Sequence, residues 1–147
     1  MKKLYLALVT AFVLVMTPIA TVQARILIHN NYGATIKYKI IRPSGKEEAE
    51  KPINNGEEVT ICSDLTCLSG VSHPTTAHNP DAISDIQIRT TGKGSGYGLS
   101  PYTSLKNDLI DIVTDLPKMK IRNRGAIIHI DPSSYLSPWN IRLEFIR

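Results

Sequence analysis

The chain has 147 residues, of which 42% are hydrophobic and 20% charged, so it is long enough for one ordinary domain and too short for two. Its formal net charge of +4 includes Lys2 and Lys3, which lie in a segment that we expect to be removed. Without them, 15 Lys and Arg residues face 13 Asp and Glu residues, and a net charge of +2 is too small to make nucleic acid the expected partner.

Residues 1–24 have the three parts of a secretory signal peptide. A basic Met-Lys-Lys start precedes an apolar run over residues 4–16, and a small residue, Ala24, suits a signal peptidase. The run has 13 residues, whereas a transmembrane helix needs about 20. We therefore predict cleavage after Ala24, which leaves residues 25–147 as one periplasmic or secreted domain. An uncleaved membrane anchor is the alternative.

From residue 25 onward, apolar residues recur at every second position, with Gly, Pro, Asn or Asp between the runs, which is typical of β-strands. Lys37 and Lys39 alternate with Ile and Tyr residues, so one strand face is charged and the other apolar. A tight turn at 30–33 predicts that the second strand folds back on the first. We expect residues 43–52 to be a surface loop. The expected strands lie at 26–28, 36–40, 59–61, 86–88, 119–121, 126–130 and 139–145. This pattern predicts an all-β fold, a single-domain antiparallel β-sandwich.

The segment 104–115 fits two secondary structures. Leu105, Leu109 and Ile112 recur at helical spacing, and Pro117 would stop a helix that begins near Ser104. Ile residues that alternate with Asp111 would suit a strand equally well. We favour a short helix near 104–115.

Cys62 and Cys67 are separated by four residues at the end of the expected third strand. In an exported protein, two cysteines this close predict a disulfide that closes a six-residue ring. A zinc site completed by His73 and His78 is the alternative, since these are ligand types that zinc prefers. The short spacing and an oxidising compartment favour the disulfide, and we expect no metal or cofactor.

The opening strand, its Asn-bearing turn, the second strand and the segment 53–61 (Ile-Asn-Asn-Gly-Glu-Glu-Val-Thr-Ile) resemble the start of thaumatin-like and related small secreted β-sandwich proteins. The resemblance covers the N-terminal quarter of the chain and implies a β-sandwich. Thaumatin-like proteins are rich in disulfides, whereas this chain has two cysteines, so we carry over the fold and no activity.

Three later segments resemble, in order, the inhibitory loops of chagasin-like cysteine-protease inhibitors, which are also small β-sandwiches. They are His-Pro-Thr-Thr at 73–76, the Gly-rich residues 92–96, and Pro-Trp at 138–139. The resemblance implies a secreted protease inhibitor as an alternative function. Its candidate contact residues are Pro74, Thr75, Thr76, Gly94 and Trp139.

His129 and Asp131 are two residues apart, so a strand would place both on one face, with Ser133 and Ser134 close behind. A small secreted hydrolase could use such a base and orienting acid, but the chain has no Gly-x-Ser-x-Gly elbow. A strand that ends in an Asp-Pro turn is the simpler interpretation, and we predict that the protein is not an enzyme.

Glycines alternate with other residues over 91–98. Exposed loops on a rigid β-sandwich often contact partners, and Lys93, Ser95, Tyr97 and Tyr102 are the candidate binding residues of this loop. The segment lacks the Gly-Lys-Ser/Thr ending of a phosphate-binding loop, so a simple flexible connection is the alternative.

Lys118, Lys120, Arg122 and Arg124 also alternate with other residues. A strand here would carry four positive charges on one face and could bind an anionic surface or polysaccharide. A charged edge that prevents strand pairing between molecules is the alternative.

These patterns together predict an exported, non-enzymatic binding or interaction protein. The chain combines a strand scaffold with long polar connections, and no catalytic arrangement is favoured over a structural one. Its ligand is not identified by the sequence, and an anionic polymer and another protein are the two partner classes that we retain.

Overall fold

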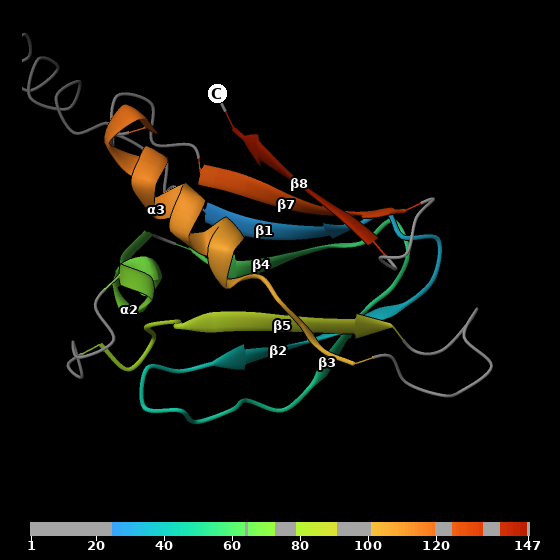
Figure 1. The fold of residues 1–147 in the computed structure, drawn as a ribbon, viewed down its shortest axis with the longest axis horizontal. Coiled ribbons are helices and arrows are strands. Elements are labelled where there is room, and N and C mark those ends of the chain that lie inside the picture. The colour runs from blue at the N-terminus through green and yellow to red at the C-terminus, as the bar shows by residue number, and fades with distance from the viewer. Residues whose placement is uncertain are drawn as a thin grey trace, which may run out of the picture.

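The computed structural model describes residues 25–63, 65–72, 79–90, 101–119, 125–133 and 139–146. These residues form two four-stranded sheets, which lie one above the other in Figure 1. Sheet A has the strand order β4 (Glu58–Cys62), β1 (Arg25–Asn30), β7 (Gly125–Pro132), β8 (Trp139–Phe145). Sheet B has the order β3 (Lys51–Ile53), β2 (Ile36–Ile41), β5 (Asp85–Thr90), β6 (Thr103–Ser104). The predicted all-β sandwich is therefore confirmed.

The core between the sheets is built from strands with alternating burial. In β2, Ile36, Tyr38 and Ile40 are buried, whereas Lys37 and Lys39 are not, as the sequence pattern predicts. Isoleucine suits this position because a β-branched side chain packs well on a pleated surface, and burying one contributes about 1.5–3 kcal/mol. The strand isoleucines that are fully inaccessible to solvent are Ile26, Ile28, Ile36, Ile53, Ile86, Ile88, Ile128 and Ile130.

An amphipathic helix covers one end of the sandwich. In Figure 1, α3 (Lys106–Met119) lies beside the ends of both sheets, next to α2 (Ser69–Ser72), which follows the 3-10 turn η1 (Leu65–Leu68). Leu109 and Ile112 of α3 are fully buried, whereas Ile110 on the opposite face is 40% exposed. The helical interpretation of residues 104–115 is confirmed.

The predicted end of this helix is wrong, because α3 continues through Pro117 to Met119. Pro117 has no backbone N–H to donate to the carbonyl four residues earlier, so the helix loses this hydrogen bond and ends two residues later. The strand expected at 119–121 is therefore wrong at Met119, and its other two residues lie outside the described residues.

The predicted hairpin between the first two strands is also wrong, since β1 and β2 belong to different sheets. The reason lies in Asn30, whose side chain is fully buried at the end of β1. Its amide group donates hydrogen bonds to the carbonyl oxygens of Ala34 and Ile53, both at 2.8 Å, and its Oδ1 accepts one from the backbone N–H of Tyr32 at 2.9 Å. These bonds fix a turn that takes the chain from sheet A to sheet B, with Gly33 at a φ of 93°.

Two smaller differences concern strand pairing. β1 pairs with β7 in parallel, with Ile28 opposite Ile128, whereas the other described strand pairs are antiparallel. The surface loop expected at 43–52 ends earlier, because Lys51 and Pro52 belong to β3, which pairs with β2 and buries Ile53.

Candidate functional site

The predicted disulfide is present between Cys62 and Cys67, with a Cα–Cα distance of 6.2 Å. It joins the end of β4 to η1, and the two sulfurs are therefore not available as thiolate ligands for zinc. His73 and His78, the other members of the alternative zinc site, lie outside the described residues.

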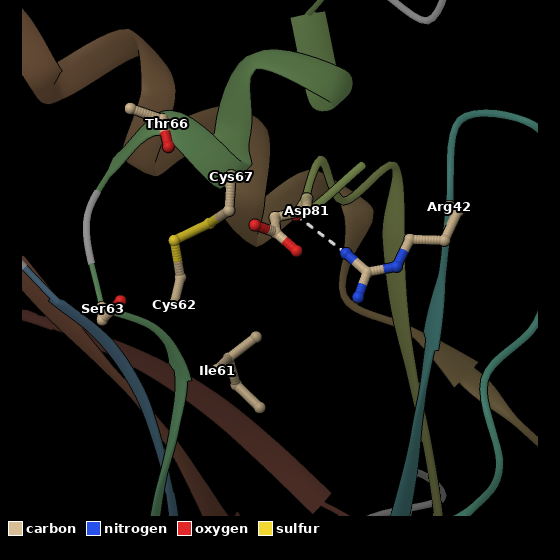
Figure 2. A pocket seen from close by; sticks show the side chains of 7 residues that line it. All are labelled: Arg42, Ile61, Cys62, Ser63, Thr66, Cys67 and Asp81. Carbon is tan, nitrogen blue, oxygen red and sulfur yellow. Dashed lines mark hydrogen bonds between the residues drawn. A yellow bond between two sulfur atoms is a disulfide. The ribbon is translucent and has the colours of Figure 1, made fainter. Parts of the chain in front are cut away.

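A cavity of about 310 Å³ lies beside this disulfide. Figure 2 shows Arg42 reaching toward Asp81 on one side of it, with Ile61 and the two cysteines on the other. The Arg42 guanidinium donates to the backbone carbonyls of Asp81 and Ala82, at 2.8 and 3.1 Å, and also pairs with Glu48. Because the guanidinium is already engaged in this way, we interpret the cavity as a structural junction between the two sheets.

The outer face of sheet B carries a network centred on Glu50. The Glu50 carboxylate accepts a hydrogen bond from Arg89 Nε at 2.6 Å, pairs with Lys37 Nζ at 3.1 Å, and accepts a short hydrogen bond from the Tyr102 hydroxyl. The Tyr102 ring in turn lies 4.1 Å from Lys39 Nζ and 4.6 Å from Arg89 Cζ, which are cation–π distances.

These contacts change the acidity of two groups. The hydrogen bond from Arg89, with those from Tyr102 and Lys37, lowers the pKa of Glu50 to about 2. The hydrogen bond to Glu50 raises the pKa of Tyr102, and burial adds to this effect. Tyr102, predicted as a binding residue of the Gly-rich loop, is therefore engaged in a network that joins β2 and β5 to the segment before β6. The positive charges of this face are largely compensated within the network.

The outer face of sheet A departs from the usual alternation of buried and exposed residues. β1 has three consecutive buried residues, and the outward-facing Leu27 is only 5% exposed. The register places Leu27 beside Ile127 and, two residues along, His29 beside His129. The solvent-facing side of a sheet with mostly antiparallel strands is commonly polar. The Leu27–Ile127 and His29–His129 pairs therefore distinguish this face from an ordinary solvated one.

The two histidines contact each other directly. His29 Nδ1 lies 3.3 Å from His129 Nδ1, and the rings are edge to face with a centroid distance of 5.3 Å. His129 Nε2 lies 2.7 Å from Glu144 Oε2, and because a carboxylate can only accept, this nitrogen is the one that carries the proton. His129 is 7% exposed.

The acid predicted to orient His129 is not the one that contacts it. Asp131 shares the outer face with His129, as predicted, but it pairs with Arg142 at 3.2 Å and accepts a hydrogen bond from Asn31 at 3.1 Å. Glu144 of β8 occupies the position beside the imidazole. Ser133 follows β7 in the chain, and Ser134 lies outside the described residues.

An open basin of about 790 Å³ lies on this face next to the histidines. Apolar side chains of β1, β7 and β8 line it, among them Leu27, Ile127 and Phe145, and charged side chains of both signs stand around them. Its lining residues are Arg25, Leu27, Glu58, Ile127, Glu144, Phe145 and Ile146. The outer face of sheet A thus combines an apolar patch, a charged border and an imidazole pair.

His29, Glu144 and Glu50 were not predicted as site residues from the sequence. A signal for the first was present, because His29 and His129 both interrupt otherwise apolar strands at outward positions. Nothing in the sequence indicated that these strands are neighbours, since they are 100 residues apart. Glu50 lies in the segment expected to be an exposed loop.

Several predicted site residues cannot be placed. These residues lie outside the described part of the chain: the predicted signal peptide of residues 1–24, the loop residues Lys93, Ser95 and Tyr97, and the basic residues Lys120, Arg122 and Arg124. Lys118 belongs to α3, so the prediction that it begins a basic strand is wrong.

Trp139 does not suit the role that the resemblance to chagasin-like inhibitors implies. It begins β8, is 4% exposed, and its indole N–H donates to the Thr103 hydroxyl at 3.2 Å. Its ring also packs edge to face against Tyr32 at a centroid distance of 5.6 Å. A side chain buried in this way serves the core. Pro74, Thr75, Thr76 and Gly94 lie outside the described residues.

The described residues include neither a membrane-spanning helix nor a ready-made metal cluster. No helix among them is both long and apolar enough to cross a membrane. In the same part of the chain, no group of three or more His, Cys, Asp or Glu side chains is arranged to hold a metal ion.

Comparisons with known proteins gave no relative. No protein-family model, no curated protein and no solved structure matches the chain.

Proposed function

We propose that the protein is an exported, non-enzymatic binding protein that holds another protein against the outer face of sheet A. The observation that supports this is the basin, in which the partly exposed Ile127 lies beside the buried Leu27 among charged residues. An apolar centre with a polar border is the usual anatomy of a protein interface.

The charges around the basin favour a protein over an anionic polymer. Arg25 contributes a positive charge, and Glu58 and Glu144 contribute negative ones. A polyanion would be repelled by the two carboxylates, whereas a protein surface can offer charges of both signs together with an apolar side chain. The proposed surface does not involve the basic residues Lys118, Lys120, Arg122 and Arg124.

The two alternative functions receive less support. In the hydrolase alternative Asp131 would orient His129, but Asp131 pairs with Arg142 instead. In the inhibitor alternative Trp139 would contact a protease, but its side chain is buried.

A pair of matched variants tests the proposed surface. Ile127→Arg places a charge in the basin, and Ile110→Arg places the same charge on the exposed side of α3. Protein recovered after export would be cross-linked in its own envelope fraction and in host material, and captured proteins identified by mass. We expect a captured partner that Ile127→Arg loses and Ile110→Arg retains.

Three results would contradict this proposal. Equal capture by both variants would place the interface elsewhere. Retention of the wild-type protein on heparin without any protein partner would indicate a polyanion ligand. Hydrolytic activity that disappears in His129→Gln would indicate an enzyme.

The export step is proposed on the composition of residues 1–24 and on the disulfide, which suits an oxidising compartment. The intact mass of the protein recovered from its host should correspond to a chain that begins at Arg25. A membrane-bound species that retains the apolar run would show that the segment is an anchor.

A further inference from the structure

The imidazole pair of His29 and His129 has the geometry of a chelating site, and we propose that these two residues bind a divalent transition metal ion such as Zn²⁺. The proposal is independent of the proposed function, because it is supported by the geometry of the two rings and by the side chains that face them. It assigns a binding role to two residues that neither the disulfide nor the core uses.

The distance between the two nitrogens is the first argument. Two nitrogens bound to one tetrahedral zinc ion, each at about 2.0–2.1 Å, lie about 3.3–3.4 Å from each other. His29 Nδ1 and His129 Nδ1 are 3.3 Å apart. Parallel strands in register hold the two Cα atoms opposite each other, so the backbone already sets the spacing that a chelate requires.

The second argument is the protonation of His129. Its Nε2–H donates to the Glu144 carboxylate, so the lone pair of the neutral ring is on Nδ1, the atom that faces His29. Histidines that ligate metals almost always donate the other ring N–H to such an acceptor, which orients the ring and raises its basicity. Glu144 is therefore a positioning residue for this site.

His29 can supply the second ligand with little rearrangement. It is partly buried, and in the described part of the chain its ring is held only by the contact with His129. The torsion that rotates a histidine ring has a broad energy minimum, so both lone pairs can turn toward one point. When the metal ion lies between the two nitrogens, the neutral His29 ring carries its proton on Nε2, which leaves the Nδ1 lone pair for the metal.

The charges that face the pair favour a cation. Glu58 of β4 is the register neighbour of His29, Glu144 extends from β8, and Asp131 follows on β7. Arg142 of β8 is the register neighbour of His129; it pairs with Asp131 at 3.2 Å and lies 3.9 Å from Glu144. Arg25 lines the adjoining basin with Glu58 and Glu144. Three carboxylates against two guanidinium groups leave this part of the face slightly negative.

The protein supplies two of the ligands, since no group of three or more suitable side chains occurs within the described residues. The remaining positions on the metal would be taken by water or by donor atoms of another molecule. A site of this kind is open on its outer side.

Zinc chloride titrated into the exported protein tests the inference, with calorimetry to give stoichiometry and affinity. We expect one zinc ion per chain and a shift of the Nδ1 resonances of His29 and His129 in nitrogen NMR spectra. His29→Gln should weaken binding at least about tenfold, because a single imidazole cannot chelate.

The chain offers a matched control in its other two histidines. The double variant His73→Gln, His78→Gln removes two imidazoles, one more than His29→Gln, and should leave zinc binding unchanged. Glu144→Gln keeps both rings and should weaken binding by about tenfold or more, since loss of the acceptor of a ligating histidine typically costs 10–100-fold.

Other outcomes would overturn the inference. They are absence of zinc binding by the wild-type protein, unchanged binding in His29→Gln, and loss of binding in the control variant. If His29→Gln does not fold, the NMR shifts of the wild-type protein and the Glu144→Gln titration decide the question, because both report on the folded pair. Unshifted Nδ1 resonances at saturating zinc would place the metal elsewhere.

Discussion

Glu50→Gln should lower the free energy of unfolding by about 2 kcal/mol at neutral pH. The carboxylate has three partners, Arg89, Lys37 and the Tyr102 hydroxyl, and its side chain is 19% exposed. Pairs this accessible contribute about 0.5–1 kcal/mol each, and glutamine retains the shape but loses the charge. For a domain of this size, the loss corresponds to a decrease of about 8 °C in Tm.

Glu47→Gln is the matched control. Glu47 pairs with Lys39 at 2.6 Å, on the same face of sheet B, but it is 56% exposed and is engaged with this one cation. A single exposed pair contributes little, so the variant should lose no more than about 0.5 kcal/mol. Urea unfolding of the wild-type protein and both variants, followed by circular dichroism, would measure the difference.

The pH dependence gives a second measurement of the same effect. The pKa of Glu50 falls from 4.5 to about 2 in the folded protein. The stabilisation by its charge is therefore fully present above pH 4.5, decreases as the pH falls through this range, and is lost near pH 2. The difference in the free energy of unfolding between the wild-type protein and Glu50→Gln should therefore decrease as the pH falls from 4.5 to 2. A difference in the free energy of unfolding of less than about 0.5 kcal/mol at pH 7, or a difference that persists at pH 2, would show that Glu50 does not stabilise the fold through its charge.

Three further changes probe the frame of the sandwich. Asn30→Ala should lower the free energy of unfolding in urea by about 3 kcal/mol, because it leaves the buried partners of the amide without hydrogen bonds. A decrease of less than about 1 kcal/mol would show that water replaces the side chain. Gly125→Ala should prevent folding, because Gly125 has a φ of 87° and an added Cβ would lie 1.8 Å from the carbonyl oxygen of Arg25. Circular dichroism would measure this, and a folded variant would mean that the start of β7 can move. Replacement of Cys62 and Cys67 by serine should cost about 2 kcal/mol, the chain-entropy value for a six-residue ring, and reduction of the wild-type protein should produce the same loss.

The features predicted correctly are those that depend on neighbouring residues in the chain. β8 has apolar residues at alternate positions and forms as predicted, and β2 follows the same pattern. The Cys62–Cys67 disulfide joins residues five apart, so spacing and compartment sufficed to predict it. Local periodicity and local spacing are physical properties of the sequence itself.

The features that were missed depend on contacts between distant segments. The pairing of β1 with β7 follows from the packing of the whole sheet, and without it His29 cannot be placed beside His129. The crossing from sheet A to sheet B depends on a buried Asn30 that bonds to Ile53, 23 residues later. Glu50 is a charged residue in a polar segment, and only the tertiary structure brings Arg89 and Tyr102 to it.

The parallel pairing of β1 and β7 also constrains when the molecule can assume its final form. β1 occupies an inner position in sheet A, and one of its two edges pairs with residues 100 positions further along the chain. Until those residues are present, an isoleucine-rich strand has a free edge and no complete partner surface, which is the condition for aggregation of strands. A chain that crosses a membrane with its N-terminus first would therefore expose β1 for most of its passage. Sheet A would be completed only when nearly the whole polypeptide has emerged, so a chaperone that protects the first strand during this interval would raise the fraction of the protein that reaches its folded state.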